Sequence, residues 1–299
     1  MNGGGRVEDS DLDWIAEDHY RMLSLAFTVR SAEKRFAERL SWHLAPFRRP
    51  EPEVQALPVD MFVQGKDLGA DRPLYSLFLA NELRYAERDV DEVLAYAVWM
   101  LHAEISAQVR DLLLIHAGAV AREGAAILLP GKAGSGKSTL VLALLRRGFA
   151  YLSDELGAID PVTRRIYPFE KRIGLDHAAL AHFGDLETHL QDQAAPELDT
   201  EKRHVRPEDV GARVSGPVEP RSIVFLSDDR SGPPRLTPVP RAETVMRLAE
   251  NSTNLYRFGE RGVILLADIV QMTQAYALTG GSSIERAECL DERLTSGER

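Results

Sequence analysis

The residues with the clearest chemistry lie between Pro130 and Asp160, in the sequence PGKAGSGKSTLVLALLRRGFAYLSDELGAID. Residues 131–138, GKAGSGKS, satisfy the phosphate-loop pattern G-x-x-x-x-G-K-[ST]. Gly134 and Gly136 let the backbone curl so that its N–H groups point at phosphate oxygens, and the start of the following helix adds partial positive charge. An apolar run precedes the loop and a helical pattern follows it, which is the context that this pattern requires. The sequence therefore predicts a nucleotide-binding loop.

The side chains of this loop have separate expected roles. Lys137 is expected to reach the β- and γ-phosphates, and Ser138 to offer its hydroxyl to Mg²⁺. The cofactors implied are ATP and Mg²⁺, although no motif for the base separates ATP from GTP. The predicted nucleotide-binding residues are Gly131, Lys132, Ala133, Gly134, Ser135, Gly136, Lys137, Ser138 and Thr139.

An acidic pair, Asp154 and Glu155, closes the strand predicted over residues 149–154. In a motor ATPase a carboxylate at this place is a magnesium ligand at the end of a buried aliphatic strand. Here the strand is short and semi-polar, which favours an Asp154 that faces an incoming hydroxyl and takes its proton as the oxygen attacks the γ-phosphorus. From the residues alone both roles remain open, and so does the choice between water and a substrate hydroxyl as the phosphate acceptor.

His116 lies on the strand predicted over residues 112–120, ahead of the loop. A lone histidine on an apolar strand packs well in a core when it is hydrogen-bonded, and the residues alone favour that interpretation. The other histidines are scattered in polar sequence and Cys289 is the single cysteine, so no thiolate metal site and no disulfide framework are predicted.

The periodicity of the chain predicts the elements that position these residues. Apolar residues from Asp11 to about Leu44 recur at mixed helical spacing. Four prolines then mark residues 45–58 as a linker or an extended edge. Strands and turns are expected over residues 61–89, and a helix over Asp91 to Arg110.

Two apolar runs, residues 112–120 and 124–130, form a predicted hairpin that delivers the chain into the phosphate loop. The helix after the loop is expected to end at Gly148. The remaining expectations are a hairpin over 156–169, a mobile loop over 191–204, a strand over 221–227, a helix over 242–251 and a last helical stretch broken by residues 279–283.

Composition limits the classes of partner. With 299 residues, 44% of them hydrophobic, the chain can form one large domain or two modest ones. A net charge of −10 argues against general nucleic-acid binding, although a local basic cluster occurs at Lys202, Arg203, His204 and Arg206. The sequence shows neither a secretory signal nor an apolar run long enough to span a bilayer, so a cytoplasmic protein without a membrane partner is expected.

Residues 112–160 resemble the catalytic core of HPr kinase/phosphorylase and its relatives, a core that is itself similar to the nucleotide-binding domain of phosphoenolpyruvate carboxykinase. The histidine, the loop lysine and the acidic pair occur in matching order and spacing. The resemblance implies an α/β fold with a P-loop kinase core. It also implies that His116 and Lys137 are catalytic, that Asp154 accepts the proton and that Ser138 binds magnesium.

The sequence also departs from this family. Glu155 stands where the family has a second aspartate, and FEKRIGLD, residues 169–176, only approximates the downstream family element. By that resemblance Glu155 and Glu170 are expected to bind metal and Arg172 to be a catalytic contact to phosphate. Residues 1–110 do not match the family's regulatory domain, so they are expected to form an α+β extension for substrate or partner recognition, ahead of a catalytic domain over 111–299.

The overall layout resembles the HPr-kinase-like proteins associated with ribosomally made peptides more than it resembles HPr kinase/phosphorylase itself. These proteins include lasso-peptide kinases that phosphorylate a serine of the precursor. The resemblance therefore implies an ATP- and Mg²⁺-dependent kinase acting on a Ser or Thr hydroxyl of a peptide or small protein. Two other functions stay open, a small-molecule kinase and a nucleotide-gated binding module with slow or no hydrolysis. The oligomeric state is not predicted, and a homo-oligomer is compatible with the sequence.

Overall fold

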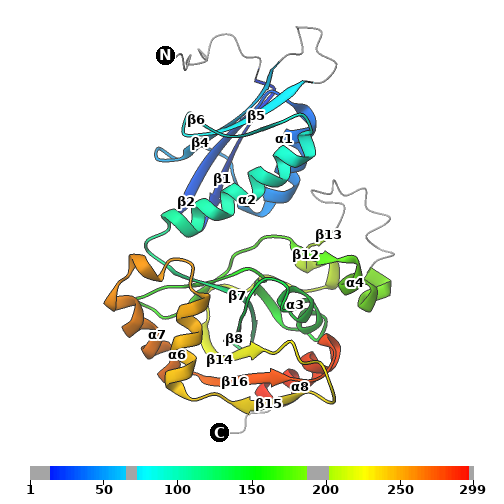
Figure 1. Ribbon diagram of the computed structural model, residues 1–299, viewed down its shortest axis with the longest axis vertical. Helices are drawn as coiled ribbons and strands as arrows, with labels where there is room; N and C mark the ends of the chain where they lie inside the picture. The colour runs from blue at the N-terminus through cyan, green and yellow to red at the C-terminus, as the bar shows by residue number, and fades with distance from the viewer. Residues whose placement is uncertain (1–13, 65–72, 187–201, 296–299) are drawn as a thin grey trace. The chain divides into compact units, whose positions relative to one another are not determined.

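The computed structural model describes residues 14–64, 73–186 and 202–295, and the chain divides into two compact units, Met1–His102 and Ala103–Arg299 (Figure 1). The division falls inside helix α2 (Val90–Gln108), whereas the sequence placed a boundary between residues 110 and 111. Both units combine helices with mixed sheets, so the α/β class is confirmed.

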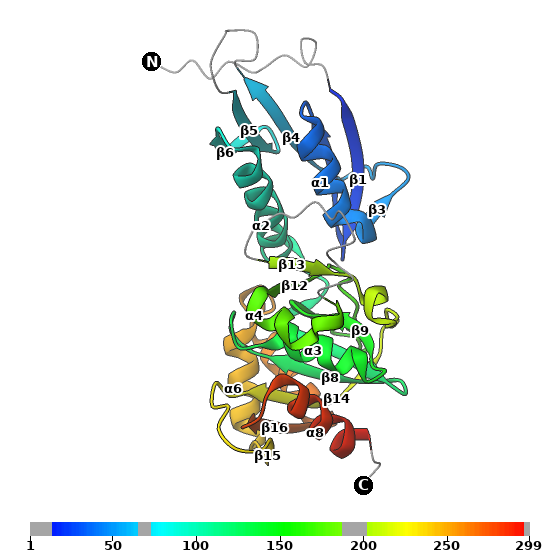
Figure 2. The same ribbon diagram turned by 90° about the vertical axis from the view of Figure 1, so that its right-hand side faces the viewer.

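The first unit is a six-stranded sheet in the order β3-β1-β2-β4-β5-β6. All neighbouring strands are antiparallel except β2 and β4, which run parallel. The strands are β1 (Ala16–Met22), β2 (Leu25–Ser31), β3 (Arg48–Arg49), β4 (Leu57–Gln64), β5 (Leu74–Leu79) and β6 (Glu82–Glu87). Helix α1 (Lys34–Leu44) and helix α2 supply the apolar side chains that cover one face of this sheet (Figures 1 and 2).

The helical periodicity expected from Asp11 onward is wrong over β1 and β2. These strands bury alternate residues, with Tyr20 paired across the hairpin to Phe27 and Val29 paired to Val59 of β4. A period of two places such side chains on one face of a sheet. The expectation holds only for α1, whereas the strands and turns expected over residues 61–89 are confirmed by β4, β5 and β6.

The second unit is built on an eight-stranded sheet in the order β11-β10-β7-β8-β14-β16-β15, with β9 also paired to β7. Strands β8, β14 and β16 run parallel, so their carboxyl ends lie at one edge of the sheet. The strands are β7 (Leu113–Arg122), β8 (Ala125–Pro130), β9 (Ala150–Ser153), β10 (Leu156–Ile159), β11 (Ile166–Tyr167), β14 (Glu219–Leu226), β15 (Arg235–Pro238) and β16 (Gln274–Thr279).

Helices cover both faces of this sheet (Figures 1 and 2). Helix α3 (Lys137–Arg146) and helix α8 (Ser283–Thr295) contribute to the apolar core on one face, and α6 (Arg241–Asn251) and α7 (Glu260–Met272) to the core on the other. Gly118 of β7 permits the close approach of α3, because a Cβ there would lie 2.8 Å from Cγ2 of Val141. A separate ribbon pairs β12 (Ile173–Asp176) with β13 (Lys202–Val205), and the short helix α4 (His177–Leu180) follows β12.

Several predicted elements of this unit are confirmed. Strands β7 and β8 form the hairpin before the loop, and β10 pairs with β11 in the second hairpin. Helix α3 ends at Arg146, and Gly148 follows its C-cap as expected, with a φ of 88° in the left-handed region that favours glycine. The strand expected over 221–227 and the helix over 242–251 correspond to β14 and α6.

Two expectations for this unit need correction. The last stretch before residues 279–283 is not wholly helical, because β16 follows α7 and pairs in parallel with β14. The loop expected over 191–204 falls partly outside the described residues, and its last residues belong to β13. Among the helices that the structure describes, none combines the length and apolar character needed to cross a bilayer.

Candidate active site

The phosphate loop joins β8 to α3 and has the backbone that its glycines permit. Gly134 and Gly136 have φ values of 79° and 86°, and Gly136 caps the N-terminus of α3. The Lys137 ammonium donates to the carbonyl oxygens of Gly131 at 2.7 Å and Lys132 at 2.8 Å. Burial lowers the pKa of Lys137, although nearby Glu155 and Asp154 oppose that shift. The loop thus holds its lysine inside the cradle that phosphate oxygens would enter.

Asp154 lies beside the loop with its carboxylate fully engaged. The Ser138 hydroxyl donates to Oδ2 at 2.9 Å, and the Tyr151 hydroxyl lies 2.9 Å from Oδ1. The Asp154 side chain is 1% exposed. Burial and the Asp154 charge raise the pKa of Tyr151 well above its ordinary value, so this phenol stays protonated as a donor. Phosphate-loop enzymes hold magnesium through a loop serine or threonine and an aspartate that closes a neighbouring strand, and Ser138 and Asp154 match that pair in residue type and contact.

Lys171 supplies the cation for the acidic pair. Its Nζ lies 3.1 Å from Asp154 Oδ1 and 3.7 Å from Glu155 Oε2, and it donates to the Arg172 carbonyl at 3.3 Å. Burial lowers the pKa of Lys171, but the two carboxylates outweigh burial and the net shift is upward. The ammonium is therefore charged at neutral pH, and it balances the buried charge of Asp154.

We expect Lys171→Met to lower the free energy of unfolding by about 3 kcal/mol, because it leaves the buried Asp154 charge without its cation. Urea denaturation followed by circular dichroism measures the change. The double variant Lys171→Met, Asp154→Asn should lose less than the sum of the two single losses, since it removes both charges together. Additive losses would show that the ion pair is not coupled.

His116 is placed at the same site by strand pairing. Its carbonyl accepts from the Gly131 amide at 3.2 Å, and the Ala117 amide donates to the Glu155 carbonyl at 3.0 Å. The imidazole Nε2 lies 3.4 Å from Glu155 Oε1, and the two side chains are 25% and 40% exposed. His116 is thus partly open on a strand whose other residues from 113 to 121 are buried, and its acidic neighbour is Glu155 rather than Asp154.

A pocket of about 310 Å³ brings these groups together. It is lined by loop and strand residues and by a wall from β12, α4 and β13, namely His116, Ala133, Gly134, Gly136, Lys137, Ser138, Thr139, Asp154, Glu155, Gly174, Leu175, Asp176, Ala179 and Lys202. The loop, the histidine and the acidic pair predicted from sequence therefore share one cavity.

Five other expected site residues do not line this pocket. Gly131, Lys132 and Ser135 belong to the loop but do not line the pocket, and neither do Glu170 and Arg172. The pKa of Arg172 is lowered to about 10 by burial and by nearby Arg206, with Asp209 and Glu208 opposing the shift. Arg172 thus faces the segment after β13, while its neighbour Lys171 faces Asp154.

Sequence reasoning missed Tyr151, Lys171 and Lys202. Tyr151 lies on β9 three residues before Asp154, and no motif in the sequence singled it out. Lys171 lies between the two residues of FEKRIGLD that the family resemblance selected. Only the folded chain shows that the lysine reaches the acidic pair.

The site fits a magnesium ion that arrives with a nucleotide. No group of three or more His, Cys, Asp and Glu side chains is placed to bind a metal ion within the part of the chain that the structure describes. Mg²⁺ needs no such group, because it keeps several waters and binds through one or two carboxylates and the phosphates of the substrate. Ser138 and Asp154 provide the donor set for this mode of binding.

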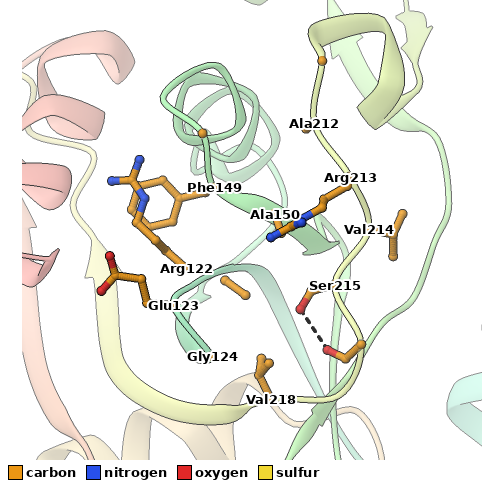
Figure 3. Close-up of a pocket in the computed structure, with 14 residues that line it drawn as sticks. Arg122, Glu123, Gly124, Phe149, Ala150, Ala212, Arg213, Val214, Ser215 and Val218 are labelled. Carbon is orange, nitrogen blue, oxygen red and sulfur yellow. Dashed lines mark hydrogen bonds between the residues drawn. The ribbon is translucent and has the colours of Figure 1, made fainter.

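A larger cavity, about 700 Å³, lies at the other end of the β7–β8 hairpin (Figure 3). Its walls come from the hairpin turn, from the residues between α3 and β9, and from residues 211–218. Arg122 stacks on the Phe149 ring at 4.4 Å and also pairs with Asp291, so its charge is used within the fold. Size does not identify the site here, because the groups suited to phosphate chemistry line the smaller pocket.

Comparison with known proteins adds no family: no protein-family model and no curated protein matches this sequence.

Proposed function

We propose that this protein is an ATP- and Mg²⁺-dependent kinase that phosphorylates a Ser or Thr hydroxyl of a peptide or small protein, on a P-loop core of the HPr kinase type. The observation that carries the proposal is a single pocket that holds the phosphate loop, the Ser138–Asp154 pair and the His116–Glu155 pair. The phosphate loop and the Ser138–Asp154 pair suit a nucleotide with its metal ion, and the His116–Glu155 pair suits the hydroxyl that accepts the phosphate.

The transfer needs few covalent steps from the protein. The acceptor oxygen attacks the γ-phosphorus, the bond from that phosphorus to the β-phosphate oxygen breaks, and ADP leaves. The amides of the phosphate loop and the Lys137 ammonium would hold the phosphates in line. Bound Mg²⁺ would neutralise charge on the β- and γ-phosphates, with Ser138 and Asp154 as its protein donors.

The geometry favours Glu155 as the group that takes the acceptor proton. The sequence favoured Asp154, but that carboxylate is 1% exposed and accepts from three surrounding groups. Glu155 is 40% exposed, lines the pocket and has His116 at its side. A general base must be within hydrogen-bond reach of the proton that it removes, so the open carboxylate suits this role better.

Incubation with ATP labelled at the γ-phosphate tests the proposal. Mg²⁺ and serine-containing peptides are supplied, and the label should move to a peptide in the presence of the full chain. Label on a small metabolite would favour a small-molecule kinase, and release of free phosphate alone would favour the nucleotide-gated module. No transfer and no nucleotide binding would refute the proposal.

His116→Ala should reduce phosphate transfer by about 10²-fold, because it removes the group that orients Glu155 toward the acceptor. Thermal stability should change little, since the imidazole is partly open and the strand hydrogen bonds of residue 116 are made by its backbone. Initial rates and thermal melting of the same preparation measure both effects. A large drop in melting temperature with a normal rate per folded molecule would assign His116 to packing.

A further inference from the structure

An arginine from a distant part of the chain lies against the phosphate loop. Arg230 belongs to the loop that follows β14, and its Nη2 donates to the Ser135 carbonyl at 3.1 Å. A Cβ on Gly136 would lie 2.6 Å from the same Nη2, so the guanidinium lies directly against the loop backbone at Gly136. Gly136 lines the nucleotide pocket and caps α3. The charge of Arg230 is thus held at the rim of the phosphate cradle.

The Arg230 side chain has spare donors at this place. It is exposed, and the bond to Ser135 is its one side-chain hydrogen bond within the part of the chain that the structure describes. No carboxylate in that part lies within ion-pair distance of it, and the neighbouring Asp229 carboxylate accepts from the hydroxyl and amide of Ser231. A guanidinium presents five N–H donors, so several remain for a ligand.

A second arginine holds the loop that carries Arg230. Arg286 of α8 is fully buried, and its Nε donates to the Gly280 carbonyl at 2.7 Å. Its Nη2 donates to the carbonyls of Ser227 at 3.0 Å and Asp229 at 2.8 Å. Burying a guanidinium is costly unless its donors are satisfied; Nε and Nη2 of Arg286 are satisfied by these carbonyls, whereas Nη1 has no hydrogen-bond partner among the residues that the structure describes. Arg286 therefore fixes the loop after β14 to the loop after β16.

Glycines let these two loops approach each other closely. Gly280 has a φ of 69°, and a Cβ there would lie 2.3 Å from the Pro233 carbonyl oxygen. The Gly280 amide donates to the Asp229 carbonyl, and the Gly281 amide to that of Gly232, both at 2.9 Å. The segment around Arg230 is thus fixed on the side of the phosphate loop by hydrogen bonds and by close packing.

The strand order places the loop that carries Arg230 at the edge of the sheet where a nucleotide would bind. Ligands of parallel α/β sheets bind outside the carboxyl ends of the strands, and the phosphate loop, the Arg230 loop and residues 280–281 follow three neighbouring parallel strands. We propose that Arg230 binds the phosphate chain of the nucleotide from the rim of the loop, in a position set by Arg286. This inference rests on the proposed nucleotide site.

Isothermal titration calorimetry of the full chain tests the role of Arg230, with Mg·ATP and with magnesium tripolyphosphate as ligands. Arg230→Ala should weaken both ligands by about 10-fold to 100-fold, because it removes charge-assisted hydrogen bonds to phosphate. Arg230→Lys should retain part of the affinity, since it keeps the charge and loses the fork. Arg213→Ala is the control, because Arg213 is an exposed arginine of the same unit beside the remote cavity.

The outcomes separate this inference from the function on which it depends. Equal binding by Arg230→Ala and wild type would overturn the inference and leave the nucleotide site standing. A loss for Mg·ATP with unchanged tripolyphosphate binding would also overturn it, because the contact would then be to the nucleoside. If wild-type protein binds neither ligand, the proposed function fails as well. If Arg230→Ala without ligand melts at a lower temperature but binds both ligands with wild-type affinity, Arg230 only stabilises the phosphate loop.

Discussion

Lys137→Ala should give a folded protein whose phosphate transfer falls by about 10³-fold or more. The ammonium donates to two carbonyls of its own loop and to no other group in the part of the chain that the structure describes, so its removal leaves the sheet and α3 packing intact. Phosphate entering the loop would replace those carbonyls as the partner of Lys137. The variant therefore loses a charge-assisted contact that strengthens as charge develops on the transferred group.

Initial rates of label transfer, with the melting temperature of each preparation, measure this effect. Lys34→Ala is a suitable control, because it removes one positive charge from an exposed site on the first unit. It should transfer phosphate at the wild-type rate. A folded Lys137→Ala protein with that same rate would show that the phosphate loop does not carry the chemistry, and would remove the basis of the proposed function.

The parts of the fold that could be predicted from sequence are those specified locally. The β7–β8 hairpin, the phosphate loop and α3 follow from adjacent apolar runs, from Gly134 and Gly136 and from the terminator Gly148. These signals depend on backbone conformations that neighbouring residues permit or exclude. The cavity shared by His116 and the acidic pair also follows, because His116 lies on β7 and the acidic pair lies between β9 and β10, both of which pair with β7 beside the loop.

The parts that could not be predicted depend on contacts between distant residues. Strand β16 is short and follows a helix directly, and its pairing with β14 is what makes it a strand. Lys171 reaches Asp154 from 17 residues further along the chain, and Arg230 reaches Ser135 from a different strand end. No spacing in the sequence encodes these distances. The sequence also does not show which residue of the acidic pair is the magnesium ligand and which is the general base. That assignment depends on which carboxylate the fold buries.

Asp154→Asn and Glu155→Gln should therefore fail in different ways. Asp154→Asn removes a buried anion that faces Ser138, so Mg·ATP affinity and turnover should fall together. The variant also leaves Glu155 as the carboxylate partner of Lys171, so the free energy of unfolding should fall. Rates must therefore be compared at an equal concentration of folded protein. Asp154→Asn combined with Lys171→Met provides a preparation without that unpaired cation.

Glu155→Gln should keep Mg·ATP affinity within about threefold of wild type and lower turnover by about 10²-fold to 10⁴-fold, as loss of a general base does. The side chain is partly exposed and its weaker contact to Lys171, at 3.7 Å, leaves the Asp154 ion pair in place, so stability should change little. Calorimetric affinity and single-turnover rates separate binding from transfer. The opposite result is that Asp154→Asn keeps its Mg·ATP affinity and loses only turnover, while Glu155→Gln loses Mg·ATP affinity. The aspartate would then be the base, as the sequence favoured, and the buried Asp154 carboxylate would have to become accessible when the nucleotide binds.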